Sequence, residues 1–168
     1  VMRVDFPKPF VSSERGKKER MKAICFVLTS PFAANAFLLG HLKALAENYR
    51  VTLCVNLEAY PLSDRLDPRV RVVHLPIARK ISVIQDLRAL LSLMMLFRHE
   101  NFDAVHSITP KAGLLAMCAS FLCGVRRRHH TFTGQVWATR TGVRRAFLKA
   151  MDRLIVAFST RVFSDSCS

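Results

Sequence analysis

The stretch "MKAICFVLTSPFAANAFLLGHLKALAENYRVTLCV" (residues 21–55) decides the fold. It opens with a continuous apolar run over 22–30, which is typical of a strand covered on both faces. Apolar residues then recur at helical spacing over 31–48, and a second apolar run follows over 50–57. A strand, a helix and a second strand in this order predict a βαβ unit with two parallel strands.

The rest of the chain repeats this alternation. We predict further strands over 70–76, 102–107, 127–133 and 161–166, and helices over 82–100, 111–124 and 144–159. The sequence therefore predicts an α/β fold, a Rossmann-like doubly wound parallel sheet of about six strands with helices on both faces. This domain covers 21–168, and the polar residues 1–20 are expected to be a disordered leader or a non-native extension.

The charge and the cysteines limit the class of protein. The formal net charge of +14 indicates an anionic partner, which can be nucleic acid, anionic lipid or a phosphorylated ligand. Five cysteines without ligand-like spacing argue against a disulfide framework and favour a reducing compartment. The longest apolar run, 89–97, is about half as long as a membrane-spanning helix, and residues 1–20 lack the apolar centre of a signal peptide.

Three polar loops are expected at the carboxyl edge of the sheet. They cover 29–36, 106–113 and 131–142 and are rich in polar or small residues. In open parallel sheets, ligands bind at this edge, where the strand order reverses. The alternative is that the loops are ordinary turns in which Asn35 and Thr109 cap helices.

Several enzyme motifs are missing from the sequence. Residues 29–36 contain no glycine, so the chain lacks the Gly-x-Gly-x-x-Gly fingerprint of dinucleotide binding after its first strand. It also has no Walker phosphate loop and no Gly-x-Ser-x-Gly nucleophile elbow. The histidines do not show the pair spacing of zinc sites. We therefore expect neither a metal site nor a cofactor in this chain.

Four stretches resemble successive motifs of one family. The stretch 21–55 contains a strand, a small-residue loop and a helix that ends in "ALAE". In "NFDAVHS", Asp103 and His106 lie in an Asp-hydrophobic-hydrophobic-His strand. "HTFTGQVW" (130–137) and "RVFSDS" (161–166) stand where a fifth-strand loop and a sixth strand follow. In this order and spacing, they resemble the glycosyltransferase-4 group of GT-B glycosyltransferases over the whole predicted domain.

The resemblance implies the N-terminal, acceptor-binding half of a retaining glycosyltransferase. Such an enzyme moves a sugar from a nucleotide-sugar donor to a glycan or lipid-linked acceptor in cell-surface polysaccharide synthesis. The donor would be bound mainly by a C-terminal domain that these 168 residues do not include, so this chain alone is expected to be inactive. The present half would hold the acceptor hydroxyl in position. By the family pattern, no metal is required.

Two positions depart from the family pattern. Thr133 stands where many members have a histidine, and Ile108 stands where they often have a second one. These differences put the transfer of a catalytic role in doubt, and no catalytic residue is predicted. His129 or His130 is an alternative source of a histidine, but neighbouring strand residues point to opposite faces, so at most one of them reaches the cleft.

The candidate acceptor-binding residues combine the family pattern with side-chain chemistry. Hydroxyl and amide groups suit sugar hydroxyls, Trp137 offers a flat face for a pyranose, and Lys111 can meet an acceptor phosphate. The alternatives are a tryptophan that closes the core and a solvated lysine at a helix end. The predicted set is Ser30, Pro31, Phe32, His106, Lys111, Thr131, Thr133, Gly134, Gln135, Trp137 and Arg140.

Basic residues cluster in the last third of the chain. The predicted membrane or anion patch is Arg126, Arg127, Arg128, Arg144, Arg145 and Lys149. The helix predicted over 82–100 is apolar nearly all round in its second half, which suits either a core helix or a helix beside an anionic membrane. Because the resemblance includes enzymes with lipid-linked acceptors, we predict a cytoplasmic protein that is peripheral on the inner face of the cell membrane.

Two other functions stay open at this point. A basic α/β domain can bind nucleic acid through its phosphates without catalysis, although aromatic residues are not interleaved with the basic ones here. Nucleic acid is therefore not the expected partner. The other function is the N-terminal half of a different GT-B enzyme, such as a sugar-nucleotide epimerase, which only the second domain would distinguish from a transferase.

Overall fold

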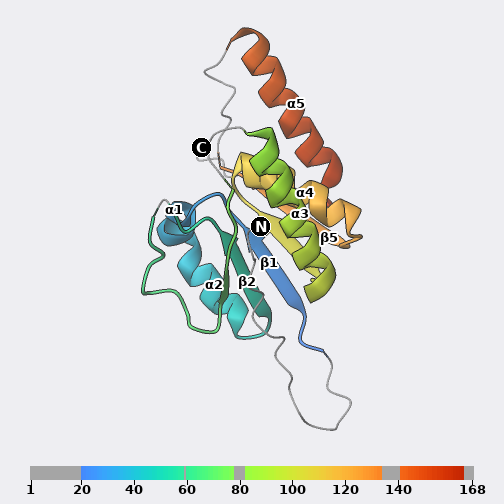
Figure 1. Cartoon of the computed structure of the whole chain (residues 1–168). Coiled ribbons are helices and arrows are strands. Elements are labelled where there is room, and N and C mark those ends of the chain that lie inside the picture. The colour runs from blue at the N-terminus through green and yellow to red at the C-terminus, as the bar shows by residue number, and fades with distance from the viewer. Residues whose placement is uncertain (1–19, 59, 78–81, 134–140, 165–168) are drawn as a thin grey trace.

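The computed structural model describes residues 20–58, 60–77, 82–133 and 141–164, and it shows a twisted parallel sheet between two layers of helices (Figure 1). All pairs of neighbouring strands are parallel, in the order β3-β2-β1-β4-β5-β6. The strands are β1 (Ala23–Val27), β2 (Arg50–Val55), β3 (Arg71–His74), β4 (Ala104–Ser107), β5 (Arg127–Phe132) and β6 (Arg161–Ser164). This order is typical of a doubly wound sheet, and the predicted fold class is confirmed.

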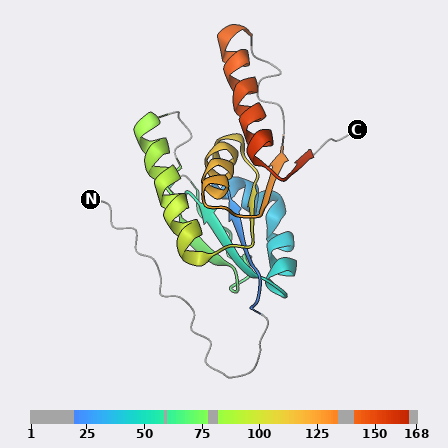
Figure 2. The same cartoon turned by 90° about the vertical axis from the view of Figure 1, so that its right-hand side faces the viewer.

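The helices are divided between the two faces of the sheet (Figure 2). They are α1 (Pro31–Ala33), the π-helix η1 (Ala34–Leu38), α2 (Leu39–Ala46), α3 (Val83–Glu100), α4 (Pro110–Leu122) and α5 (Gly142–Phe158). The segment from α1 to α2 covers one face of β1 and β2, whereas α3, α4 and α5 lie on the other face. Each predicted strand and helix is present, with bounds that differ by a few residues.

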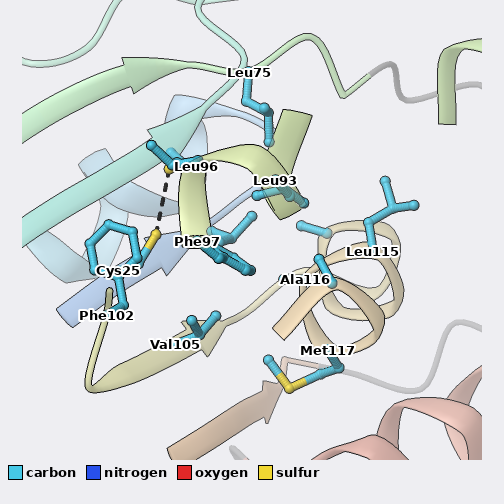
Figure 3. Close-up of a cluster of buried hydrophobic side chains, with 14 of the residues drawn as sticks. Cys25, Leu75, Leu93, Leu96, Phe97, Phe102, Val105, Leu115, Ala116 and Met117 are labelled. Atoms are coloured by element: carbon cyan, nitrogen blue, oxygen red, sulfur yellow. Dashed lines mark hydrogen bonds between the residues drawn. The ribbon is translucent and has the colours of Figure 1, made fainter. Parts of the chain in front are cut away.

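Alternation along β1 produces two hydrophobic cores. Cys25 and Val27 point toward α3 and α4, whereas Phe26 and Leu28 point toward α2. Figure 3 shows the first of these cores, in which the Sγ atoms of Cys25 and Cys54 lie 3.5 Å apart. Burial raises the pKa of Cys25 well above its ordinary value, so the thiol is neutral and packs as a small apolar group.

The first helical segment has a role for Asn35 that the sequence did not predict. Asn35 lies inside η1 and does not cap a helix. Its Nδ2 donates to the carbonyl of Pro61 at 3.1 Å, and its Oδ1 accepts from the backbone N–H of Ser63 at 2.9 Å. The suggested cap is therefore wrong, because the side-chain amide of Asn35 is hydrogen-bonded to the loop between β2 and β3 and connects this loop to η1.

The C-terminal end of α4 lies close to its predicted position. Gly124 is the last residue of the helix predicted over 111–124; it follows α4 with a φ of +70°, the left-handed region that glycine adopts at low cost. None of the described helices combines the length and hydropathy needed to cross a bilayer.

Candidate functional site

The carboxyl edge of the sheet brings three polar loops together. The chain runs from β1 to β2 and β3 on one side and returns to β4, β5 and β6 on the other, so the order reverses between β1 and β4. Val27 pairs with Ser107, and Ser107 pairs with His130, which places the ends of β1, β4 and β5 side by side. The loops that were predicted to form the site therefore begin at adjacent points of one edge.

Two of these loops are joined by threonine hydroxyls. The backbone N–H of Thr29 donates to Oγ1 of Thr109 at 3.1 Å, and the two hydroxyls are hydrogen-bonded to each other. Thr109 occupies the N-cap position of α4, but its side chain makes no cap hydrogen bond. Thr109 thus stands at the suggested cap position, but its hydroxyl does not cap the helix. The hydroxyl instead holds the loops after β1 and β4 together at the crevice.

Of the three acceptor-binding residues predicted in the loop after β1, only one is exposed to solvent. Ser30 and Pro31 are buried, and Pro31 begins α1. Phe32 is 64% exposed. An aromatic ring at this edge offers an apolar face to a ligand, whereas Ser30 and Pro31 shape the turn.

His106 and Thr131 lie together on the face of the sheet that carries α2. Nε2 of His106 is 2.8 Å from Oγ1 of Thr131, and the imidazole lies 5.1 Å from the ring of Phe26. Burial, followed by the charges of neighbouring histidines, lowers the pKa of His106 to about 4. The imidazole of His106 is therefore neutral near pH 7. It also borders a cavity of about 300 Å³ that His129 and Phe163 line as well.

His129 and His130 point to opposite faces, as the strand geometry predicts. His130 is completely buried, and its Nδ1 lies 2.8 Å from the hydroxyl of Ser107. Its ring packs edge-on against Phe132, with centroids 4.5 Å apart, and occupies the space that a β-carbon on Gly113 of α4 would need. His130 is thus a structural residue. Neither Ser107 nor Gly113 was among the predicted site residues. The glycine within the first turn of the helix predicted over 111–124 was the one sign in the sequence of close packing there.

Lys111 is neither solvated nor unpaired. Its Nζ lies 2.7 Å from Oδ1 of Asp86, and both side chains are mostly buried. The pair joins the first turn of α4 to the first turn of α3. An acceptor phosphate at Lys111 would therefore have to share the lysine with Asp86.

The remaining predicted acceptor residues follow β5. Thr133 is exposed directly after this strand. Gly134, Gln135, Trp137 and Arg140 lie outside the described residues, so their roles stay predictions. Within the described ranges, no three side chains of the ligand types are grouped as a metal ion would require.

The predicted anion patch is divided between the two edges of the sheet. Arg126, Arg127 and Arg128 lie at the start of β5, at the amino edge, whereas Arg144, Arg145 and Lys149 lie in the first half of α5, which starts at the carboxyl edge. Six basic residues that are near in sequence are thus not one surface.

Arg128 has a structural role at the amino edge. Its Nε donates to the carbonyl of Phe158 and its Nη1 to the carbonyl of Val125, both at 2.6 Å. Its guanidinium also lies over the ring of Phe121, 5.4 Å from the centroid. The arginine therefore neutralises the carbonyl end of α5 and is not oriented toward an external anion.

Comparison with known proteins gives matches over most of the chain. A family described as Glycosyl transferase 4-like domain matches residues 33–167. A UDP-Gal:alpha-D-GlcNAc-diphosphoundecaprenol alpha-1,3-galactosyltransferase of Escherichia coli is 41% identical over 46% of this chain and 20% of its own length. The capsular polysaccharide biosynthesis glycosyltransferase CapM of Staphylococcus aureus is 32% identical over 55% of this chain and 24% of its own length. The chain thus spans only a minor part of these relatives.

Solved structures share the fold. MurG of Acinetobacter baumannii superposes with a TM-score of 0.62 at 14% identity, over 88% of this chain and 42% of its own. The UDP-GlcNAc 2-epimerase of Methanocaldococcus jannaschii superposes with a TM-score of 0.56 at 15% identity, over 87% of this chain and 40% of its own. These likenesses concern the architecture alone.

Proposed function

Because the chain belongs to the glycosyl transferase 4-like domain family, we propose that it is the acceptor-binding half of a glycosyltransferase. The full enzyme would move a sugar from a nucleotide-sugar donor to a lipid-linked sugar acceptor in cell-surface polysaccharide synthesis. The names of the two relatives, which include a diphosphoundecaprenol-linked acceptor and capsular polysaccharide, support this substrate class. The observation that carries the proposal is the polar edge of the sheet at the ends of β1, β4 and β5. There the loops after β1 and β4 are hydrogen-bonded to each other, and a histidine of β4 is hydrogen-bonded to a threonine of β5.

The described side chains suit the positioning of an acceptor. The hydroxyls of Thr131 and Thr133 can donate to or accept from sugar hydroxyls, and the neutral His106 fixes the orientation of Thr131. The Thr29–Thr109 contact holds the two neighbouring loops in place, so the edge is formed before the acceptor binds. Holding the acceptor hydroxyl in one orientation lowers the entropic part of the activation barrier.

The direct test is a transfer assay with a lengthened protein. The lengthened protein is a polypeptide in which a C-terminal donor-binding domain follows residue 168. It should transfer radiolabelled sugar from a UDP-sugar to a polyprenyl-diphosphate-linked acceptor. Residues 1–168 alone serve as the control that is expected to be inactive. Turnover by residues 1–168 alone would contradict the division into halves. No transfer by the lengthened protein, together with tight and salt-dependent binding of RNA or DNA, would favour the nucleic-acid function instead.

Replacing Trp137 or Thr133 with alanine in the lengthened enzyme should lower the transfer rate about 10- to 100-fold, because one stacking or hydrogen-bonding contact to the acceptor is lost. The melting temperature should stay within a few degrees of the wild type. Melting temperature and rate are measured on the same preparations. If Trp137 instead closes the core, its replacement should cost about 3–5 kcal/mol of stability and leave the specific activity of the folded enzyme normal.

We also propose that the protein lies on the cytoplasmic face of the cell membrane. A diphosphate-linked lipid acceptor would be presented there, and the inner leaflet is anionic. Arg144, Arg145 and Lys149 support the proposal, because they lie on the first half of α5, at the same edge as the crevice; the two arginines are exposed and the lysine is half-buried. The residues at the start of β5 are not part of this surface.

Vesicle binding should therefore depend on lipid charge and salt. We expect residues 1–168 to co-sediment with vesicles that contain phosphatidylglycerol, and binding should weaken at high salt because the Debye length falls to ~3 Å at 1 M. Replacing Arg144, Arg145 and Lys149 with glutamine should reduce binding, whereas replacing Arg126 and Arg127 should have little effect. Equal loss in both sets would show that only total charge matters.

A further inference from the structure

Helix α3 has an apolar surface on its solvent side as well as on its core side. Ala89, Leu93, Leu96 and Phe97 are buried against the sheet and α4. On the solvent side, the exposed fractions are 80% for Val83, 67% for Ile84, 54% for Leu87, 49% for Leu91 and 52% for Met95. Their spacing places them along one side of the helix, which we call the α3 stripe. Burial in the core therefore accounts for the inner side of this helix but not for these five exposed side chains.

The charged groups around the α3 stripe are cationic. Both carboxylates of α3 are engaged by cations from other elements, Asp86 by Lys111 at 2.7 Å and Glu100 by Arg71 at 2.9 Å. Arg88 and Arg98 are exposed on the same helix. A partner that contacts the α3 stripe thus meets apolar side chains bordered by positive charge.

The stripe also lies close to the proposed acceptor crevice. The Asp86–Lys111 ion pair joins the first turn of α3 to the first turn of α4, which begins at the carboxyl end of β4. Figure 2 shows that α3 and α5 both begin at this end of the molecule, and that their first turns extend past the sheet. An apolar helix surface and the basic first half of α5 therefore flank the same edge.

We infer that the α3 stripe inserts into the headgroup and upper acyl region of an anionic phospholipid leaflet. The inference rests on the proposed function and adds the element that enters the lipid. A helix with an exposed apolar side and cationic borders binds in the plane of the interface, with its apolar side about 5–10 Å deep. A second copy of this chain is the less suitable partner, because two proteins with a net charge of +14 repel each other.

The first experiment measures insertion directly. A single tryptophan is placed at the stripe by Leu87→Trp, with Trp137→Phe removing the native one. On phosphatidylglycerol-containing vesicles, lipids with a spin label on the upper acyl chain should quench its fluorescence. The matched control is Leu122→Trp in the same background, because Leu122 is 57% exposed at the far end of α4 and should not be quenched.

The second experiment removes the stripe. The triple variant Ile84→Gln, Leu87→Gln, Leu91→Gln keeps good helix formers at exposed positions, so the melting temperature should not fall. Its partition into anionic vesicles at 0.5 M salt should fall at least about tenfold, since the apolar contribution persists when charge is screened. Leu122→Gln should leave the partition unchanged.

Three outcomes would overturn the inference. If the protein binds vesicles without quenching at position 87, attachment is electrostatic alone, and the proposed peripheral location still stands. If it binds no vesicles while the lengthened enzyme is active, both membrane attachment and the stripe's role are wrong, but the transferase function is not. If sedimentation velocity shows a dimer that the triple variant abolishes, the stripe is an interface between copies.

Discussion

Replacing Gly113 with alanine is expected to destabilise the domain by about 3 kcal/mol, the upper end of the usual range for overpacking. A β-carbon at this position would lie 2.5 Å from Cε1 and 2.8 Å from Nδ1 of His130. The imidazole cannot move away easily, because it is completely buried and hydrogen-bonded to Ser107. A loss of this size should lower the melting temperature by about 6–12 °C in a protein of this length.

Gly40→Ala is the matched control for this prediction. Gly40 is also helical, in α2, but a β-carbon added there would have no other group within 4 Å, so alanine should stabilise by about 0.5–1 kcal/mol. A second control is Gly113→Ala combined with His130→Ala, in which the new methyl group has space and should cost nothing relative to His130→Ala alone. An unchanged melting temperature for Gly113→Ala would contradict the observed packing of His130 under α4.

The order of strands and helices could be predicted because the chain has strong and regular hydrophobic runs. Residues 22–30 and 50–57 contain few polar side chains, so their burial on both faces of a parallel sheet follows from composition. The exposed side of α3 could not be predicted in the same way. Its outer leucines and its inner leucines are chemically the same, and only the packing of the helix against the sheet and α4 decides which are buried.

The edge that carries the candidate site was predictable, whereas the partners of its side chains were not. Fold topology places the ends of β1, β4 and β5 together, whatever residues follow them. Thr109 and Asn35 have a cap-like composition, but each makes a hydrogen bond to a loop that is distant in sequence. Lys111 illustrates the same limit, because its ion pair with Asp86 depends on the packing of α3 against α4.

Lowering the pH from 6.5 toward 4 should remove about 5 kcal/mol of folding free energy. Burial, followed by neighbouring charges for His106, lowers the pKa of both His106 and His130 from 6.5 to about 4 in the folded state. Between these values, the unfolded chain binds protons that the folded chain does not, so stability falls as the pH falls. About 2–3 kcal/mol is expected from each histidine, and the lowered pKa of His129 acts in the same direction.

The carboxylates should contribute little within this window. Burial would raise the pKa of Glu100, but its ion pair with Arg71 brings the pKa below 4.5 on balance. Its stabilising charge is thus present above pH 4.5 and is lost only when the pH falls further, through the folded-state pKa.

Urea unfolding at several pH values between about 7 and 4.5 measures how steeply the free energy of unfolding changes with pH. The variants His106→Gln and His130→Gln show how much of this slope each histidine contributes. Each variant should lose roughly half of the pH dependence, whatever its stability at neutral pH, because the slope counts only the protons taken up on unfolding. If both variants keep the wild-type slope, the two imidazoles are not the groups that titrate. The neutral, half-buried His106 on which the proposed positioning of Thr131 depends would then be wrong as well.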